Sequence, residues 1–243
     1  MKTIIVIPVR MASTRFPNKP LALIEGKPMI QRVWEQAISS NLGEVLVACS
    51  EIEVFNIVSS LGGNCIMTDP KLPSGTDRVF AAIRDYSQID QYDSIINLQG
   101  DMPLINSNDI KRVNKPLIQG FDIGTLVTNL SSEDEKNYNI TKAKISWIKK
   151  NEIGEAVNFY KNSKGILDNI YHHVGIYSFS YSSLEKFIKI PPSTNELLYK
   201  LEQLRALDAK MTIGVNYVKD VPISIDTKSD LIELQKIINK NND

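Results

Sequence analysis

Short apolar runs alternate with amphipathic segments through the first half of the chain, and this alternation restricts the available folds. The run Thr3–Val9, TIIVIPV, is typical of a strand buried on both faces. In Pro28–Ser40 the apolar residues form one helical stripe, with Pro28 suited to the first turn. Further strands are expected at Glu44–Ser50, Asn64–Thr68 and Asp93–Gln99, and further helices at Glu51–Leu61, Thr76–Tyr86 and Ser107–Ile118. This order predicts an α/β fold with a mostly parallel sheet flanked by helices.

The pattern changes after about Leu130. Strand-like runs then follow with little helix between them, at Lys144–Lys149, Glu155–Tyr160 and His172–Phe179. Two helices are expected at Ser183–Ile190 and Asn195–Ala209, and the tail reads as strands at Thr212–Val218 and Val221–Ile225 before a helix at Asp226–Lys240. We therefore expect one compact domain, in which a nucleotide-type core of residues 1–130 and 211–243 carries an inserted mixed subregion, 131–210.

Composition excludes several classes of protein. The chain has 28 basic and 28 acidic residues among 243, so it lacks the basic excess of a general nucleic-acid binder. Its apolar runs are far shorter than the roughly 20 residues that span a bilayer. Pro8 and Arg10 interrupt the first apolar run, which favours a buried strand over a signal peptide. Cys49 and Cys65 are expected as free thiols, and the cytoplasm as the compartment.

The loop after the first strand, RMASTRFPNK, carries three cations and no acid. In open α/β sheets, ligands bind at the carboxyl ends of the parallel strands. Arg10, Arg15 and Lys19 could therefore surround a polyphosphate, with Ser13 and loop amides as neutral donors. The alternative is a solvated basic turn. Neither GxGxxG nor GxxxxGK[ST] occurs here, so the loop would bind phosphate by another design.

A second motif, SGTDR, comprises Ser74 to Arg78. Ser74 or Thr76 could simply cap the following helix. The same geometry would let Arg78 and the two hydroxyl groups face a ligand. Taken alone, this motif is weak evidence for either reading.

Two carboxylates are candidates for a metal site. Asp101, in NLQGDMP, follows an interior strand, and Asp226, in ISIDTKSD, lies between the last strand and the last helix. Either aspartate could serve only a turn or a helix cap. However, Thr227 and Asp230 already have capping-box spacing, which leaves Asp226 free. Mg²⁺ commonly takes one or two carboxylates together with substrate phosphate, so we expect Mg²⁺ beside the basic loop.

The inserted subregion contains the two histidines of the chain, in YHHVGIY. His172 and His173 alternate faces on a strand, so one of them can point into a given cleft, beside Tyr177. Adjacent histidines without cysteine partners do not suit zinc. In LEQLR, Glu202 and Gln203 are polar mid-helix residues, and a solvated helix face is their simplest interpretation.

These motifs occur together, in order, in one family. The segments IIVIPVRMASTRFPNKPL, SGTDR, NLQGDMP, HVGIYSF, LEQLRAL and ISIDTKSDL resemble the 3-deoxy-manno-octulosonate (Kdo) cytidylyltransferases, from about residue 3 to 238. The sialic-acid cytidylyltransferases fit less well, because their first loop usually carries a glycine-serine-lysine pattern. The resemblance implies a nucleotide-diphospho-sugar-transferase-like (Rossmann-like) fold and a Mg²⁺-dependent reaction of CTP with Kdo, giving CMP-Kdo and diphosphate for lipopolysaccharide synthesis.

The resemblance also implies roles for individual residues. The CTP-binding set would be Arg10, Ser13, Arg15, Lys19, Ser74, Thr76 and Arg78, and the metal ligands would be Asp101 and Asp226. The sugar-binding set would be Gln99, His173, Tyr177, Glu202 and Gln203. Arg15, Lys19, Asp101 and Asp226 would be catalytic. The family further implies a homodimer formed through the inserted subregion.

Three departures from the family pattern leave the sugar open. Met102 replaces the glutamate of the usual QGDEP, and Lys161 stands where a sugar-contacting arginine is common. STNELLYK, which includes Tyr199, replaces a helix that usually begins SPLE. Alternative substrates are therefore other ulosonic acids such as 8-amino-Kdo. A third hypothesis is a catalytically idle nucleotide-sugar-binding homologue.

Overall fold

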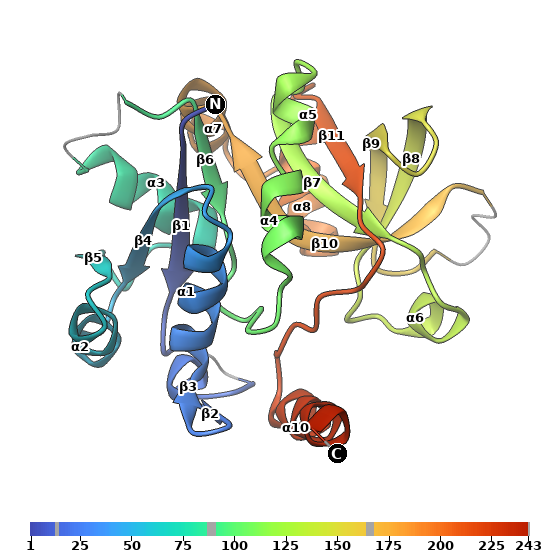
Figure 1. Cartoon of the computed structure of the whole chain (residues 1–243). Coiled ribbons are helices and arrows are strands. Elements are labelled where there is room, and N and C mark those ends of the chain that lie inside the picture. Colours follow the sequence, from blue (N-terminus) through green and yellow to red (C-terminus); the bar gives the residue numbers. More distant parts are fainter. Residues whose placement is uncertain (13–14, 87–90, 164–167, 243) are drawn as a thin grey trace. The chain divides into compact units, whose positions relative to one another are not determined.

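A computed structural model of the chain describes residues 1–12, 15–86, 91–163 and 168–242 (Figure 1). By its internal contacts the chain divides into two compact units. The amino-terminal unit comprises Lys2–Tyr92, Asn97–Ile110 and Pro222–Asp243, and the central unit comprises Met1, Asp93–Ile96 and Lys111–Val221. The expected insert, 131–210, falls inside the central unit, and its functional role stays a prediction.

The amino-terminal unit has a parallel β-sheet with helices on both faces. Its elements are β1 (Thr3–Val9), η1 (Lys19–Leu21), β2 (Leu23–Ile24), β3 (Lys27–Pro28), α1 (Met29–Ser39), β4 (Gly43–Cys49), α2 (Ile52–Ser60), β5 (Asn64–Met67), α3 (Gly75–Arg84) and α10 (Lys228–Asn242). Strands β5, β4 and β1 pair in parallel, in that order. Helices α1 and α3 lie on opposite faces of these strands (Figure 1). Every residue of β1 is buried, as its unbroken apolar run predicts.

A small cluster of apolar side chains connects α10 to the loop after β1. Phe16, Ile24, Met29, Ile225 and Leu234 are its buried members. Phe16 comes from the basic loop. Ile225 lies just before α10, and Leu234 lies within this helix. The cluster therefore fixes the loop that carries Arg15 and Lys19 against the segment that carries Asp226.

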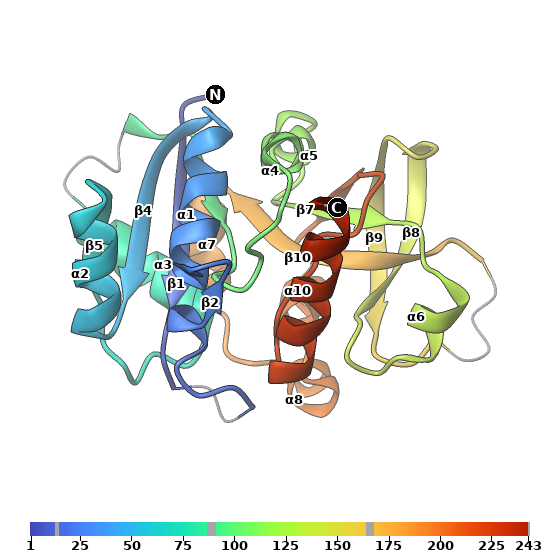
Figure 2. The ribbon, with the colours of Figure 1, turned by 60° about the horizontal axis from the view of Figure 1, so that its bottom comes forward.

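The central unit is mixed and largely antiparallel. Its strands, in sheet order, are β6 (Ser94–Asn97), β10 (Ile170–Phe179), β7 (Ile123–Thr128), β11 (Ile213–Tyr217), β9 (Ile153–Tyr160) and β8 (Lys142–Lys149). Its helices are α5 (Lys115–Ile118), α6 (Ser132–Lys136), α7 (Tyr181–Lys189), α8 (Thr194–Tyr199) and α9 (Gln203–Asp208), while α4 (Ser107–Arg112) lies where the chain enters this unit. Strand β11 runs parallel to β7, whereas β10 runs antiparallel to it. Figure 2 shows the same ribbon from a second direction.

Strand β10 contains a bulge that the sequence pattern does not reveal. Val174 lies opposite Leu126, yet Tyr177 lies opposite Thr125, so β10 advances three residues while β7 advances one. In a regular strand the Cα atoms of His173 and Tyr177 would lie about 13 Å apart. In this bulged strand the centroids of their two rings are 5.5 Å apart, so the side chains pack together.

Three local expectations are wrong. Val221–Ile225 forms no strand: Pro222 has no N–H to give a ladder, and the N–H of Ile225 donates to the Asp101 carbonyl at 2.9 Å. The expected helix Asn195–Ala209 is interrupted at Lys200, which has left-handed backbone with φ 55°. The expected helix Ser107–Ile118 is two short helices, and Pro116 stands in the first turn of the second.

The interruption between α8 and α9 is stabilised by a buried ion pair. The Arg205 guanidinium donates to both carboxylate oxygens of Glu196, at 2.7 and 2.6 Å, and their side chains are 7% and 12% exposed. Glu196 also completes a capping box with Ser193. The guanidinium lies 4.9 Å from the centre of the Phe187 ring. A sequence without glycine or proline at this point can therefore still break its helix.

We expect Arg205→Met to lower the free energy of unfolding by about 3 kcal/mol, because it leaves the Glu196 carboxylate buried without its cation. Urea denaturation of the full chain measures this change. The matched control is Lys189→Met, since Lys189 pairs with Glu185 at 3.0 Å on an exposed helix surface. That control should change stability by less than about 0.5 kcal/mol. Equal effects of the two substitutions would contradict the role of the buried pair.

Candidate active site

The basic loop after β1 is anchored at its centre and exposed at its cations. Phe16 is buried in the cluster with α10, whereas Arg10 and Arg15 are exposed. Asn18 has left-handed backbone, and its N–H donates to the Met11 carbonyl at 3.3 Å. This turn places Lys19 at the start of η1, within the unit. Ser13 lies outside the described residues.

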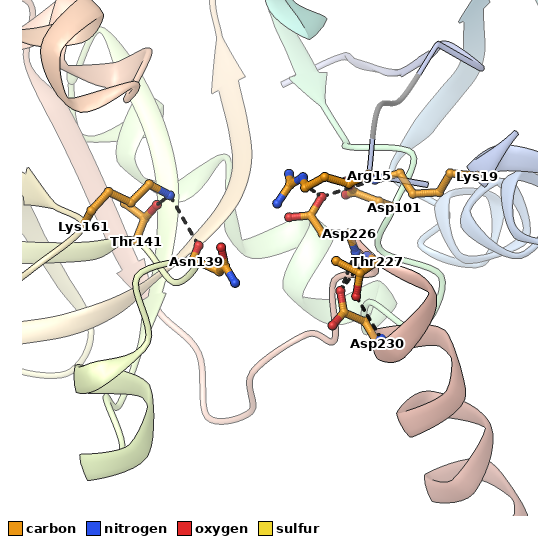
Figure 3. A network of polar contacts seen from close by, with 9 residues as sticks. All are labelled: Arg15, Lys19, Asp101, Asn139, Thr141, Lys161, Asp226, Thr227 and Asp230. Carbon is orange, nitrogen blue, oxygen red and sulfur yellow. Dashed lines mark hydrogen bonds and ion pairs between the residues drawn. The ribbon is translucent and has the colours of Figure 1, made fainter. Parts of the chain in front are cut away.

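The two candidate metal ligands meet at Lys19. The Lys19 Nζ lies 2.9 Å from Asp101 Oδ2 and 3.4 Å from Asp226 Oδ1 (Figure 3). Arg15 Nη2 lies 3.3 Å from the same Asp226 oxygen. A backbone hydrogen bond from Ile225 to Asp101 joins the two acidic segments directly. Side chains separated by 82 and 207 positions in the sequence thus form one cluster of balanced charge. Asp101 follows β6, as the carboxyl-end rule indicated, whereas the strand expected before Asp226 does not form.

The start of α10 is capped by Thr227 and Asp230, not by the Asp226 carboxylate. The Asp230 carboxylate accepts from the N–H groups of Asp226 and Thr227, both at 2.8 Å, and the Asp230 N–H donates to the Thr227 hydroxyl at 3.3 Å. This confirms the capping box predicted from the spacing of Thr227 and Asp230. The Asp226 carboxylate is consequently available to Lys19 and Arg15.

A pocket of about 500 Å³ opens in the amino-terminal unit beside this cluster. It is lined by Pro8, Val9, Arg10, Ala12, Arg15, Lys19, Pro20, Ser74, Gly75, Arg78, Gln99, Gly100, Asp101 and Asp226. The structure therefore brings together nearly all of the predicted CTP-binding and metal-binding residues. Gln99 also lines this pocket, although the family resemblance implied that it binds the sugar.

The SGTDR motif caps α3, and its Ser74, Gly75 and Arg78 line the pocket. Ser74 caps α3, because its Oγ accepts from the Asp77 N–H at 3.1 Å. Gly75 lies close to Gln99: a Cβ at Gly75 would be 3.3 Å from the Gln99 Oε1. Thr76 is buried and accepts from the Asn97 amide at 3.3 Å. The cap thus positions the first turn of α3 at the pocket wall.

Arg78 is a buried cation at the pocket wall. Its side chain is 1% exposed, and its Nη1 donates to the Thr68 hydroxyl. Within the described residues, its Nη2 has no hydrogen-bond partner. Burial lowers the pKa of Arg78 from its usual value. A buried donor of this kind is suited to an oxygen acceptor on a bound ligand.

The predicted sugar-binding residues other than Gln99 lie in the central unit. The His173 ring packs against Phe159 and Tyr177, and its Nε2 lies 3.0 Å from the Thr125 hydroxyl. Thr125 also donates to the Ile176 carbonyl within the bulge, at 2.8 Å. The Thr125 oxygen is then free to accept from His173, which fixes the neutral ring with its proton on Nε2.

Burial controls the ionisation of this group of residues. Burial, assisted by the positive charges of His172 and Lys161, lowers the pKa of His173 to about 3. Burial, followed by the negative charge of Glu202, raises the pKa of Tyr177. Both side chains are therefore neutral hydrogen-bonding groups near pH 7. Gln203 is 8% exposed, so the solvated helix face considered for it is wrong.

Lys142 and Lys161 donate hydrogen bonds to the loop of residues 137–141. Neither lysine was among the predicted site residues. Lys142 is fully buried, and its ammonium donates to the carbonyls of Asn137, Ile140 and Lys161 at 2.5, 3.1 and 3.1 Å. Lys161 donates to the Thr141 hydroxyl at 3.1 Å and the Asn139 carbonyl at 3.3 Å (Figure 3). The signal available in the sequence was Lys161 at the position of the family's arginine. Lys142 carries no such signal, because a lysine at the start of a strand is expected to be exposed.

Other sequence expectations can be checked directly. Both cysteines are free thiols, as expected, and Cys65 is only partly buried. Met102, which stands in place of the family's glutamate, is 5% exposed. Across the ranges that the structure describes, no helix combines the length and hydrophobicity needed to cross a membrane.

Comparison with known proteins gives a consistent match. The cytidylyltransferase family model matches residues 4–213. The 3-deoxy-manno-octulosonate cytidylyltransferase of Paramagnetospirillum magneticum is 44% identical over 231 residues, which is 94% of each chain. The Brucella ovis protein of the same name is 42% identical over 234 residues, covering 95% of this chain and 93% of the relative.

Solved structures resemble the chain over nearly its whole length. A CMP:2-keto-3-deoxy-manno-octonic acid synthetase in complex with CTP has a TM-score of 0.89 and 30% identity, covering 99% of this chain and 100% of the other. A UDP-glucose pyrophosphorylase in complex with UDP-glucose has a TM-score of 0.72 at 14% identity, over 99% of this chain and 100% of that one, and so supports the fold. The α/β, nucleotidyltransferase-like fold predicted from the sequence is confirmed.

The buried neutral His173 predicts a pH dependence of stability. Its pKa is near 6.5 in the unfolded chain and about 3 in the folded one, so the unfolded state binds more protons between these values. Stability therefore falls as the pH is lowered from 6.5. His173→Gln should remove about 1 kcal/mol of the loss between pH 6 and pH 5, measured by urea denaturation. Equal pH slopes for wild type and His173→Gln would contradict this assignment.

Proposed function

The chain belongs to the 3-deoxy-manno-octulosonate cytidylyltransferases of the cytidylyltransferase family, and we propose that it transfers the cytidylyl group of CTP to Kdo. The products are CMP-Kdo and diphosphate, and CMP-Kdo serves lipopolysaccharide biosynthesis. The observation that carries this proposal is the pocket in which Lys19, Asp101 and Asp226 meet beside Arg10 and Arg15.

The cations of the first loop suit the triphosphate of CTP. Arg10, Arg15 and Lys19 line the pocket together, and Arg10 and Arg15 are exposed to an incoming ligand. An arginine offers paired donors to phosphate oxygens, and a lysine offers a mobile point charge. Arg15 and Lys19 stabilise the charge that develops on the leaving diphosphate, because phosphoryl-type transfer depends mainly on positioning and charge stabilisation.

The carboxylate pair suits a divalent cation. Asp101 and Asp226 present oxygens within 2.9 and 3.4 Å of one ammonium, so a single cation can interact with both. Two carboxylates completed by phosphate oxygens are a usual ligand set for Mg²⁺. Bound there, Mg²⁺ would neutralise phosphate charge and lower the pKa of the attacking sugar hydroxyl. Asp101 and Asp226 are thus the proposed metal ligands.

The remaining pocket residues suit the cytidine part of CTP. Ser74 and Arg78 line the pocket, and Thr76 lies in the same first turn of α3. The buried Arg78 supports recognition of a base or ribose oxygen, since a buried donor discriminates strongly against a ligand that cannot accept from it. Ser13 keeps its predicted place in this set.

The sugar-binding role is proposed for Gln99, His173, Tyr177, Glu202 and Gln203. His173 and Tyr177 support it as neutral donors or acceptors for sugar hydroxyls, because both are buried and un-ionised near neutral pH. Lys161 is the proposed cation for the carboxylate of the sugar. Its ammonium is held by Thr141 and Asn139, on the loop that Lys142 anchors.

A second candidate is a cytidylyltransferase for another ulosonic acid, such as 8-amino-Kdo. The observations that favour it are the buried Met102 and the use of Lys161 in place of arginine. A catalytically idle nucleotide-sugar-binding homologue is less well supported, because the pocket keeps Arg15, Lys19, Asp101 and Asp226 together. The proposed enzyme acts as a homodimer in the cytoplasm and binds no nucleic acid, as the family resemblance and the balanced charge predict.

An assay of diphosphate release tests the proposed reaction. The protein is incubated with CTP, Mg²⁺ and each member of a panel of ulosonic acids. We expect release with Kdo, and 8-amino-Kdo is the first competitor to include. Release with another acid and not with Kdo would favour the second candidate. No release with any acid would remove the enzymatic proposal.

Asp226→Asn should lower kcat by roughly two to three orders of magnitude, the usual effect of removing one preorganised group that stabilises charge. Circular dichroism should show an unchanged fold, because Asp226 does not cap α10. The matched control is Asp230→Asn, since asparagine can keep the cap. Its kcat should stay within about threefold of wild type, as expected for a surface substitution worth some tenths of a kcal/mol. Near-normal turnover of Asp226→Asn across a Mg²⁺ titration would refute its role as a metal ligand.

A further inference from the structure

Lys19 occupies the position between the two acidic side chains of the pocket. Its Nζ contacts Asp101 Oδ2 at 2.9 Å and Asp226 Oδ1 at 3.4 Å. The Lys19 side chain is 15% exposed, and the Asp101 and Asp226 side chains are 23% and 40% exposed. Among these ion pairs, the contact with Asp101 is the more buried and the shorter. Such partly shielded charges interact more strongly than pairs on the open surface.

The charges of this cluster already balance. Arg15 Nη2 lies 3.3 Å from Asp226 Oδ1, so two cations face two carboxylates. A divalent cation that bound to both carboxylates would take an oxygen of each at about 2.1 Å, in the space between them where the Lys19 ammonium now lies. It would also lie close to an ammonium and a guanidinium of like charge. Lys19 and a divalent cation therefore compete for the same pair of carboxylates.

The backbone of Lys19 is fixed, but its side chain can move. The Lys19 N–H donates to the Phe16 carbonyl at 3.2 Å, and Phe16 and Pro20 on either side are buried. Withdrawal of the ammonium from the carboxylates thus requires rotation of the lysine side chain alone. A nucleotide triphosphate in the pocket supplies the anionic oxygens that would accept it, since Lys19 and Arg15 both line this space.

We propose that Lys19 is the resident cation of the Asp101–Asp226 pair and makes binding of a divalent metal dependent on the nucleotide. This inference rests on the proposed function of the pocket as a site for CTP. The triphosphate brings the negative charge that attracts Lys19 and Arg15 away from the carboxylates, and the metal then takes their place. Metal and nucleotide affinities are consequently coupled, and each must strengthen the other by the same factor.

Titration with Mn²⁺ alone, followed by calorimetry or by loss of the free-ion signal in electron paramagnetic resonance, tests the proposal. In the wild-type protein we expect weak binding of Mn²⁺ alone and at least about tenfold tighter binding with saturating CTP, after subtraction of the Mn²⁺ that CTP binds in a titration without protein. Lys19→Met keeps the apolar stem and removes the charge. It should bind Mn²⁺ alone at least about tenfold more tightly than wild type and should show a smaller effect of CTP.

The matched control is Lys27→Met, because Lys27 also forms a lysine–carboxylate pair, with Glu35 at 2.8 Å, outside the pocket. It should leave Mn²⁺ affinity unchanged. Lys19→Met combined with Asp226→Asn should lose the gain, which assigns it to the carboxylate pair. Lys19→Gln replaces Lys19→Met if thermal denaturation shows that the methionine variant is unfolded.

Two results would overturn the proposal: no gain in Mn²⁺ affinity when the Lys19 charge is removed, or a gain that persists when Asp226 is also replaced. Neither measurement requires the sugar or turnover. Failure of the proposed enzymatic function is detected separately, by the absence of diphosphate release from CTP with every ulosonic acid. A protein that releases diphosphate but binds Mn²⁺ equally well with and without Lys19 would keep its function and lose this inference.

Discussion

The ion pairs of Lys19 with Asp101 and Asp226 are the interaction on which the amino-terminal unit depends for its pocket. They connect the loop after β1, the turn after β6 and the segment before α10. Opposite charges at these separations attract one another, most strongly where the side chains are partly buried. The hydrophobic cluster of Phe16 with Ile225 and Leu234 holds the same loop and helix together from the other side. Charge balance and apolar packing therefore support one geometry.

The central unit uses a different principle, because its polar groups are neutralised by burial and hydrogen bonding. The bulge of β10 brings His173 near Tyr177, and the Thr125 hydroxyl contacts both His173 and the bulge. A neutral ring whose Nε2 proton is donated to Thr125 keeps Nδ1 as a directed acceptor, without an ionic attraction for phosphate. Lys142 satisfies three carbonyls in the same unit. The amino-terminal unit thus gathers its polar groups as ion pairs at one pocket, whereas His173 and Tyr177 of the central unit are buried neutral groups.

The sequence pattern was most informative where local physics determines the outcome. The unbroken apolar run of β1 and the apolar stripe of α1 predicted both elements, and the spacing of Thr227 and Asp230 predicted the cap of α10. It was least informative where distant contacts decide. Lys200 adopts left-handed backbone because the α8–α9 break is held by Glu196 and Arg205, and no glycine or proline announces it. Strand β7 was also missing from the predicted elements, although its residues are buried.

By itself, the sequence determined the identity of the charges: cations in the first loop, an aspartate after an interior strand and another before the last helix. The carboxyl-end rule for parallel strands then indicated that Asp101 would lie beside the first loop, whereas the strand expected before Asp226 does not form. Only the tertiary structure decided how they meet, with Lys19 between the two aspartates and Gln99 in the same pocket. The physical reason is that hydrogen bonds and ion pairs depend on separations of a few ångströms, which a chain sets through packing between residues remote in sequence.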